Sequence, residues 1–131
     1  MSDKLTIWKY KNISVYYDEK YEGGGRYLAL PFVNFIKNCL PNDCYVKAFE
    51  WCAGFGFIGF ALLSEGICDN LCLGDINPLA LECVNATISK NRLKDKVSYY
   101  LSDNLQAIPS KERFDLVVAN PPNFYLQNPV R

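Results

Sequence analysis

The chain has 131 residues, half of them hydrophobic, and its 14 lysines and arginines balance its 14 aspartates and glutamates, so the formal charge at pH 7 is zero. This length and apolar content suit one domain with a buried core, residues 1–131, and exclude a disordered protein, while the balanced charge counts modestly against a nucleic-acid substrate. Apolar runs stay below the about 20 residues of a membrane span and the N-terminus lacks an apolar signal core, so we expect a cytoplasmic protein with no membrane partner.

Residues 1–43 are predicted to form an N-terminal flap and a helix. The stretch from Leu5 to Tyr17 is rich in β-forming residues and predicts a short β-hairpin or an edge segment. Glu22 to Tyr27 contains three glycines and is predicted to be flexible, either as a hinge over a ligand site or as a plain linker. Apolar residues at helical spacing from Leu30 to Leu40 predict an amphipathic helix.

Residues 44–131 are predicted to form a cofactor-binding core in which strands alternate with helices. The strands are expected at about 45–50, 71–75, 97–101 and 114–119, and the helices follow a glycine loop at 54–59 and the Asn77-Pro78 cap. This alternation is typical of an α/β fold, a Rossmann-like doubly wound parallel sheet with flanking helices.

Each predicted strand of this core is followed by a polar residue. These residues are Glu50, Asp75, Asp103 and Asn120. Because parallel strands bind ligands at their carboxyl ends, we expect the four side chains to converge on one site.

The glycine loop carries the spacing Gly54-x-Gly56-x-x-Gly59 between a strand and a helix. Glycines allow a ligand to approach the backbone closely, and the start of the helix offers free N–H groups. Asp75 follows where a carboxylate can accept two ribose hydroxyls, so the pattern predicts a nucleotide-like cofactor and also fits NAD.

Histidine is absent and the six cysteines form no CxxC pair. The missing histidine excludes histidine general bases, Ser-His-Asp hydrolysis and histidine metal ligands. We therefore expect buried, reduced thiols and no metal site.

Four motifs in combination resemble those of class I S-adenosylmethionine-dependent methyltransferases, specifically the Asn-Pro-Pro type that methylates planar amino groups. The motifs are FEWCAGFGFIG, LGDINPLAL, LSDN and VVANPPNF, and they lie between about Tyr45 and Phe124. The resemblance implies that S-adenosyl-L-methionine is the cofactor. It also implies a cofactor site whose residues are Glu50 with the backbone of Ala53, Gly54 and Gly56 at the methionine moiety, Asp75 at the ribose, and Ile76, Asp103 and Asn104 at the adenine.

By the same resemblance, Asn120, Pro121 and Pro122 are the catalytic residues. The Asn120 and Pro121 carbonyl groups would accept hydrogen bonds from the two N–H groups of the substrate amine and so orient its lone pair. Asn123 stands where the motif usually has an aromatic residue, so Phe124 or Tyr125 is expected to stack on the substrate. Cys52 stands where these enzymes commonly have glycine, a replacement that is tolerated if its thiol points into the core.

The resembled sheet continues beyond the strand at 114–119, whereas this chain stops at Arg131. We therefore expect a C-terminally truncated domain or fragment, or a homodimer or other partner that covers the apolar edge of this strand.

The leading hypothesis is an S-adenosylmethionine-dependent N-methyltransferase acting on a planar amino group of a protein glutamine or of a nucleic-acid base. One alternative is an NAD-dependent oxidoreductase, which the glycine spacing also fits, although Glu50 would repel a pyrophosphate. The other is a non-catalytic module that binds S-adenosylmethionine or assembles with a partner.

Overall fold

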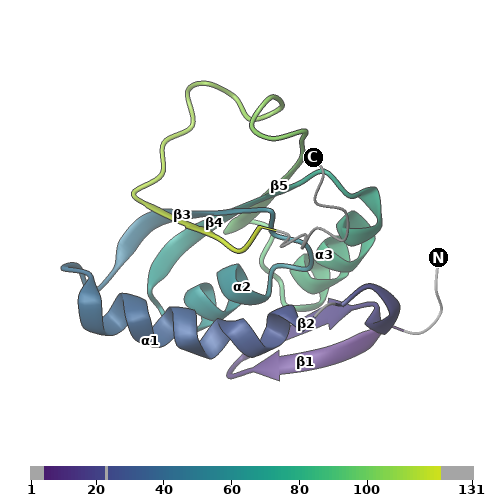
Figure 1. Ribbon diagram of the computed structural model, residues 1–131, viewed down its shortest axis with the longest axis horizontal. Helices are drawn as coiled ribbons and strands as arrows, with labels where there is room; N and C mark the ends of the chain where they lie inside the picture. The colour runs from purple at the N-terminus through teal and green to yellow at the C-terminus, as the bar shows by residue number, and fades with distance from the viewer. Residues whose placement is uncertain (1–4, 23, 122–131) are drawn as a thin grey trace, which may run out of the picture.

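The computed structural model describes residues 5–22 and 24–121. Two short strands are followed by three α-helices and a second group of four strands, and Figure 1 shows their arrangement. In chain order the elements are β1 (Thr6–Tyr10), β2 (Ile13–Tyr17), the 3₁₀ turns η1 (Glu19–Tyr21) and η2 (Gly25–Leu28), α1 (Ala29–Cys39), β3 (Tyr45–Trp51), α2 (Phe57–Ser64), β4 (Cys68–Asp75), α3 (Pro78–Lys90), β5 (Val97–Leu101) and β6 (Leu116–Ala119). The predicted hairpin and the predicted strands and helices of the core are confirmed, and β4 begins earlier than expected.

The main sheet is parallel throughout and has the order β5-β4-β3-β6. The chain moves outward from β3 to β4 and β5, then returns to pair β6 with the other side of β3. Such a reversal of direction opens a crevice at the carboxyl ends of the two strands that flank it. The fold therefore places a ligand crevice beyond the carboxyl ends of β3 and β6.

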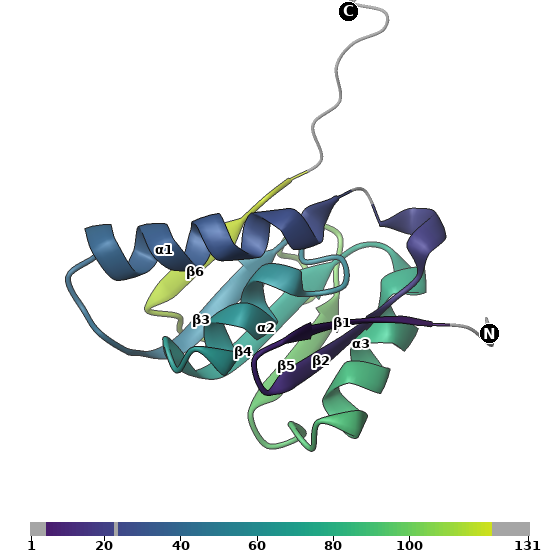
Figure 2. The same ribbon diagram turned by 90° about the horizontal axis from the view of Figure 1, so that it is seen from below.

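Helices α1, α2 and α3 and the hairpin lie on one face of this sheet (Figures 1 and 2). Phe60 and Leu62 of α2 are fully buried there against Leu71 and Leu73 of β4. A Cβ atom on Gly59 would lie 2.8 Å from Leu71 Cδ1 and 2.9 Å from Glu50 Oε1. Glycine at this position therefore lets α2 approach the sheet closely.

The opposite face of the sheet is covered, in the described residues, by the connection 102–115 between β5 and β6, which contains turns and no helix. The Phe114 ring stacks on the Phe49 ring with 4.8 Å between centroids, and Lys47 Nζ lies 2.7 Å from Glu112 Oε1. The expected parallel sheet with flanking helices is confirmed. On the face that carries no helix in the described residues, the Phe49–Phe114 ring pair and the Lys47–Glu112 ion pair hold the connection against the sheet.

The β1–β2 hairpin is held against the core by aromatic packing and by side chains of α3. Trp8 packs edge-on against Phe57 at 5.4 Å. The N–H groups of Ser14 and Tyr16 donate to Asn91 Oδ1 at 2.9 Å and to Thr87 Oγ1 at 2.8 Å. These bonds give hydrogen-bond partners to backbone N–H groups on the edge of β2 that does not pair with β1. The hairpin is therefore an integral part of the domain.

The glycine-containing segment after the hairpin adopts a defined turn. Gly24 has φ 91° and caps η2, and Arg26 Nη1 lies 2.7 Å from Glu22 Oε1. The Arg26 guanidinium also lies over the Tyr27 ring at 4.5 Å. Part of the predicted flexible segment is thus fixed by an ion pair and a cation–π contact.

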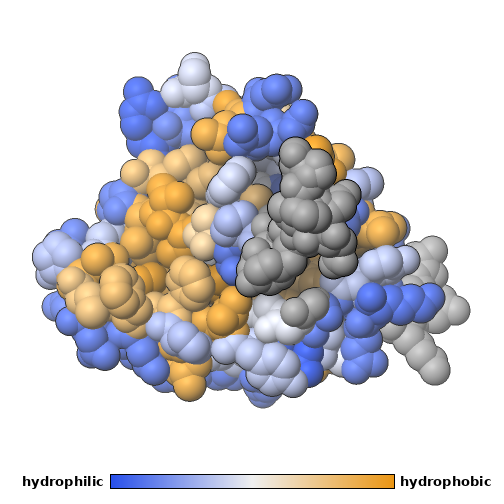
Figure 3. Space-filling view, viewed as in Figure 1, coloured by the Kyte–Doolittle hydropathy of each residue, from blue (hydrophilic) through white to orange (hydrophobic). Residues whose placement is uncertain are grey.

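Strand β6 has no strand on its outer side in the described part of the chain. Apolar side chains gather where β6 and α1 lie in the view of Figure 3, and the exposed ones on these elements are Leu30, Phe35 and Val117.

Within residues 5–22 and 24–121, no helix is both long enough and apolar enough to cross a membrane.

Candidate functional site

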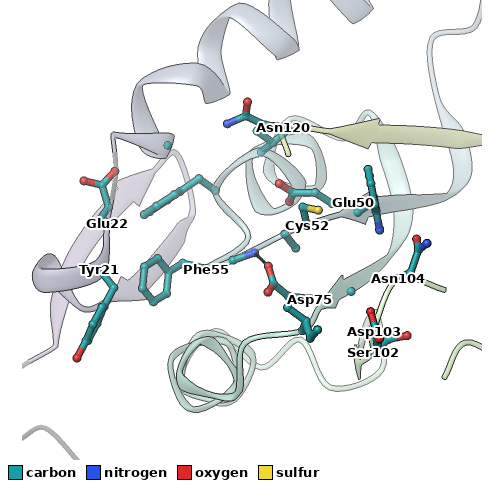
Figure 4. A pocket seen from close by; sticks show the side chains of 18 residues that line it. Tyr21, Glu22, Glu50, Cys52, Phe55, Asp75, Ser102, Asp103, Asn104 and Asn120 are labelled. Carbon is teal, nitrogen blue, oxygen red and sulfur yellow. Dashed lines mark hydrogen bonds between the residues drawn. The ribbon is translucent and has the colours of Figure 1, made fainter. Parts of the chain in front are cut away.

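A pocket of about 620 Å³ lies at the carboxyl ends of the four parallel strands. Figure 4 shows residues from the ends of β3, β4, β5 and β6 around it, together with residues from the N-terminal segment. The expected convergence of Glu50, Asp75, Asp103 and Asn120 on one site is what the structure shows. The crevice predicted by the strand order is therefore lined by the polar residues that follow the strands.

Glu50 is the most buried charged residue of the pocket, with 3% of its surface exposed. The N–H of Gly59 donates to its Oε1 at 2.7 Å. Burial raises the pKa of Glu50 to about 8, the Gly59 hydrogen bond opposes this shift, and the nearby charge of Asp75 adds to it. A cationic ligand group would favour the charged form of Glu50, so the pocket is suited to a cation at this point.

Asp75 connects the glycine loop to the start of α3. Its Oδ2 accepts a hydrogen bond from the Gly54 N–H at 2.6 Å, and its Oδ1 accepts one from the Asn77 N–H at 2.9 Å. The Gly54 N–H is therefore already hydrogen-bonded within the chain. A carboxylate has about four lone-pair sites, so each Asp75 oxygen can still accept a ribose hydroxyl.

The β5 side of the pocket is formed by Ser102, Asp103 and Asn104, with Ile76 on the neighbouring loop. Ser102 is buried, and its Oγ accepts the Ala107 N–H at 2.9 Å. Asp103 and Asn104 are exposed, and Ile76 is 62% exposed. An apolar side chain and two polar ones at an open rim provide a surface on which a heteroaromatic ring can lie.

Three residues of the N-terminal segment, Tyr21, Glu22 and Gly25, form a wall of the pocket that sequence reasoning did not assign. In Figure 4, Tyr21 and Glu22 lie opposite the β5 side. The only signal in the sequence was the glycine run, which we interpreted as a hinge over the site or a linker. The Glu22–Arg26 ion pair shapes the segment, and its contact with α2, where a Cβ atom on Gly25 would lie 3.4 Å from the Phe57 ring, places it at the site.

Asn120 lines the pocket at the end of β6, and its side chain is exposed. Its carboxamide points away from Asp75 in Figure 4. Pro121 is exposed and does not line the pocket. Pro122, Phe124 and Tyr125 lie outside the described residues, so their assigned roles remain predictions.

Two expectations about the glycine loop need revision. Gly56 is not among the residues that line the pocket; it has φ 84°, and a Cβ atom there would lie 2.8 Å from the Phe60 ring, so backbone conformation and packing require glycine. The expectation of buried thiols is wrong for Cys52, as it is for the exposed Cys39 and Cys44. Cys52 is partly exposed, lines the pocket and has φ 56°, because the tight turn after β3 directs it there.

The comparisons with known proteins agree with this geometry. The chain is 33% identical over 84 residues to the release factor glutamine methyltransferase of Clostridium botulinum. The aligned region covers 63% of this chain and 30% of that protein. It is 34% identical over 87 residues to the ribosomal RNA small subunit methyltransferase C of Haemophilus influenzae, covering 66% of this chain and 25% of that protein. The chain thus spans less than a third of the length of these curated relatives.

Among solved structures, a tRNA methyltransferase of M. jannaschii superposes with a TM-score of 0.69 at 25% identity, covering 92% of this chain and 36% of that one. Residues 33–128 match the family described as methyltransferase small domain. The chain therefore belongs to the methyltransferase small domain family.

Proposed function

We propose that this chain binds S-adenosyl-L-methionine in the pocket at the carboxyl ends of its strands and transfers a methyl group to a planar amino nitrogen. The observation that carries the proposal is the convergence of Glu50, Asp75 and Asp103 with Asn120 in one pocket of about 620 Å³. Three carboxyl groups around an apolar wall match a ligand with a cationic amino-acid end, a ribose diol and an aromatic base.

Each group of the chain has a part in this proposal. Buried Glu50 would balance the positive charge of the methionine end, and Asp75 would accept the ribose hydroxyls. Ile76, Asp103 and Asn104 would border the adenine. S-adenosylmethionine supplies a methyl carbon activated by a sulfonium.

Asn120 would position the methyl acceptor. An amide or exocyclic amine nitrogen shares its lone pair with a π-system, so it reacts only when it is held in line with the methyl carbon and the sulfur. The Asn120 and Pro121 carbonyl groups would accept its two N–H bonds. The substrate nitrogen, so held, would take the methyl group that the cofactor supplies as its C–S electron pair returned to sulfur, and it would then release one proton to solvent.

The acceptor class is a protein glutamine or a nucleic-acid base. The similar Clostridium botulinum protein is named as a glutamine methyltransferase and the Haemophilus influenzae protein as a ribosomal RNA methyltransferase. Both substrates present a planar nitrogen to the same kind of site, so similarity supports either.

Calorimetric titration of the purified chain with S-adenosylmethionine, S-adenosylhomocysteine and NAD tests the cofactor. We expect the two adenosyl ligands to bind, NAD not to bind, and Asp75→Ala to weaken the binding. Asp69→Ala is a matched control, because Asp69 is an exposed carboxylate at the opposite end of β4. Binding of NAD in place of the adenosyl ligands would support the oxidoreductase alternative and refute the proposal.

Transfer of tritium from methyl-labelled S-adenosylmethionine to glutamine peptides and to RNA tests the reaction itself. We expect label in one of these acceptors and none with Asn120→Ala. Cofactor binding with no transfer to any amine would leave a non-catalytic binding module and refute the enzymatic part of the proposal.

A further inference from the structure

A second groove lies on the molecule away from the pocket. It has a volume of about 630 Å³ and runs between α3 and β5, which are neighbours in Figures 1 and 2. Its residues come from the exposed side of α3, from the loop that follows the helix and from the edge strand β5. They are Leu81, Asn85, Ile88, Ser89, Arg92, Lys94, Val97 and Tyr99.

The loop at one end of this groove holds an uneven share of the positive charge of a chain that is neutral overall. Lys90, Arg92, Lys94 and Lys96 lie within seven residues, with Asp95 as the single acid among them. None of the four takes part in an ion pair among the described residues, whose pairs involve Lys11, Arg26, Lys37 and Lys47. Lys90 lies in the last turn of α3, where a cation is favoured by the helix dipole. That explanation does not extend to Arg92 and Lys94.

Arg92 also stands in an unfavourable backbone conformation. Its φ is 57°, immediately after the C-cap of α3, where glycine or asparagine is preferred. A non-glycine residue in this region costs about 1–2 kcal/mol. Such strain is a reason to look for a function of the side chain that occupies the position.

The groove combines these cations with an apolar floor and neutral polar groups. Leu81, Ile88, Val97 and the Tyr99 ring are apolar, while Asn85 and Ser89 are exposed and make no side-chain hydrogen bond within the described residues. Nucleic-acid strands present the complementary combination: phosphates that bind Arg and Lys, hydroxyl groups that bind amides, and flat bases that pack on apolar and aromatic surfaces.

We propose that the groove between α3 and β5 binds the phosphodiester backbone of a single-stranded nucleic acid, with Arg92 and Lys94 as its phosphate contacts. The groove begins at Leu81, close to the start of α3, and α3 itself follows directly from Asp75 of the cofactor pocket. From Leu81 to its last residue, Lys90, the helix extends for about 14 Å at its usual rise per residue, and Arg92 follows two residues later. A strand lying along it would have one end near the carboxyl edge of the sheet, where the methyl acceptor is proposed to bind.

The charges of the two sites support this arrangement. The pocket is bordered by the carboxylates of Asp75 and Asp103, which repel phosphates and favour a cation. Phosphates would therefore be held at the groove, outside the pocket. The assignment of a nucleic acid as the methyl acceptor rests on the proposed function, whereas the groove as a binding site does not.

Fluorescence anisotropy of a labelled oligouridylate, measured over a range of salt concentrations, tests the groove. The variant is Arg92→Gln with Lys94→Gln, and the matched control is Lys9→Gln with Lys111→Gln, which removes two exposed lysines elsewhere and the same total charge. We expect the groove variant to weaken binding on the order of tenfold at low salt and to reduce the slope of log K against log salt by about 1.4, or about 0.7 for each lost phosphate contact. The control is expected to bind as the unaltered chain does.

Equal weakening in both variants would show that only overall charge matters and would overturn the proposal, as would unchanged binding in the groove variant.

Polyglutamate serves as the second probe. If it binds at the groove and oligouridylate does not, the partner is an acidic protein segment and the proposal is wrong. S-adenosylmethionine affinity, measured for the same variants, is expected to stay unchanged. If the unaltered chain does not bind S-adenosylmethionine, the proposed function is refuted, whereas the result for the groove still stands.

Discussion

The backbone N–H of Gly54 donates a 2.6 Å hydrogen bond to Oδ2 of Asp75, and this bond ties the loop after β3 to the carboxyl end of β4. Asp75 also accepts the Asn77 N–H with its other oxygen. One carboxylate thus fixes the glycine loop and the start of α3 before any ligand is bound. Asp75, the residue expected to bind the ribose, therefore also stabilises the backbone conformation of the pocket.

Asp75→Asn is predicted to loosen the glycine loop even without cofactor, because a neutral amide accepts the Gly54 N–H more weakly than a carboxylate does. We expect the free energy of unfolding to fall by about 1.5–3 kcal/mol, the range of a hydrogen bond to a charged group. Urea denaturation measures this change, and hydrogen exchange at Gly54 should become faster. Asp69→Asn is the control; equal effects of the two substitutions would contradict the role of Asp75 in the loop.

Glu50 is predicted to release a proton when a cationic cofactor binds. Its pKa is raised to about 8 by burial, so the carboxyl group is largely protonated at pH 7. A bound cation favours the charged form, so affinity should increase with pH up to about 8 and then level off. Calorimetry in buffers with different ionisation enthalpies measures the released proton. Glu50→Gln should abolish the dependence, and an unchanged dependence would show that another group titrates.

The same pKa makes a prediction for the ligand-free protein. A carboxyl group whose folded pKa lies above its unfolded value stabilises the fold below the unfolded pKa, near 4.3 for glutamate, and this contribution is lost as pH rises toward 8. Thermal unfolding between pH 5 and 8, compared with Glu50→Gln, separates this contribution from those of other groups.

Cys52→Gly is predicted to stabilise the protein. Cys52 has φ 56°, a conformation that glycine adopts without strain. Relief of this strain is partly offset by the greater freedom of glycine in the unfolded chain, so we expect a gain of about 0.5–1 kcal/mol in the free energy of unfolding. Denaturation of Cys52→Gly and Cys52→Ala measures it. Cys52→Ala keeps the strain and should give no gain; equal gains would attribute the effect to loss of the thiol.

Glu65 is predicted to be a main source of stability lost in acid. Its carboxylate contacts Lys37 Nζ at 2.8 Å, Tyr10 OH at 2.7 Å and Lys11 Nζ at 3.3 Å, and these contacts, led by Lys37, lower its pKa to about 2. A carboxyl group with a lowered folded pKa stabilises the fold above its unfolded pKa, and the contribution is lost as pH falls from about 4.3 to 2.

Because the two lysines are exposed, we expect Glu65→Gln to cost about 1–2 kcal/mol at pH 7. The cost should vanish near pH 2, which urea denaturation at several pH values tests. A cost that is independent of pH would indicate packing and not charge. Glu112→Gln offers a comparison, since Glu112 pairs with Lys47 on the other face of the sheet.

The outer edge of β6 is predicted to associate with another strand, in a second copy or another partner. Val117 on this strand is 59% exposed, and unpaired strand edges of this kind promote pairing. Light scattering should show a mass that rises with concentration, and Val117→Lys should reduce the rise. A monomer at all concentrations would exclude the homodimer.

The amino-acid sequence by itself determined the order of elements and the positions of most pocket residues. Hydrophobic periodicity and the glycine spacing are local properties, so they located β3, α2 and α3 without knowledge of the fold. The ends of parallel strands meet at one edge by geometry alone, which is why Glu50, Asp75, Asp103 and Asn120 could be predicted to converge.

Only the tertiary structure decided which groups share the pocket across long distances in the chain. The η2 turn packs against α2, where a Cβ atom on Gly25 would lie 3.4 Å from the Phe57 ring, and this packing places Tyr21, Glu22 and Gly25 at a site built mainly by β3 and β4. The Gly54–Asp75 bond, the left-handed turn at Cys52 and the groove beneath Arg92 and Lys94 are of the same kind. Each depends on how separate elements pack, and packing is set by the whole chain, whereas periodicity is set by neighbours in sequence.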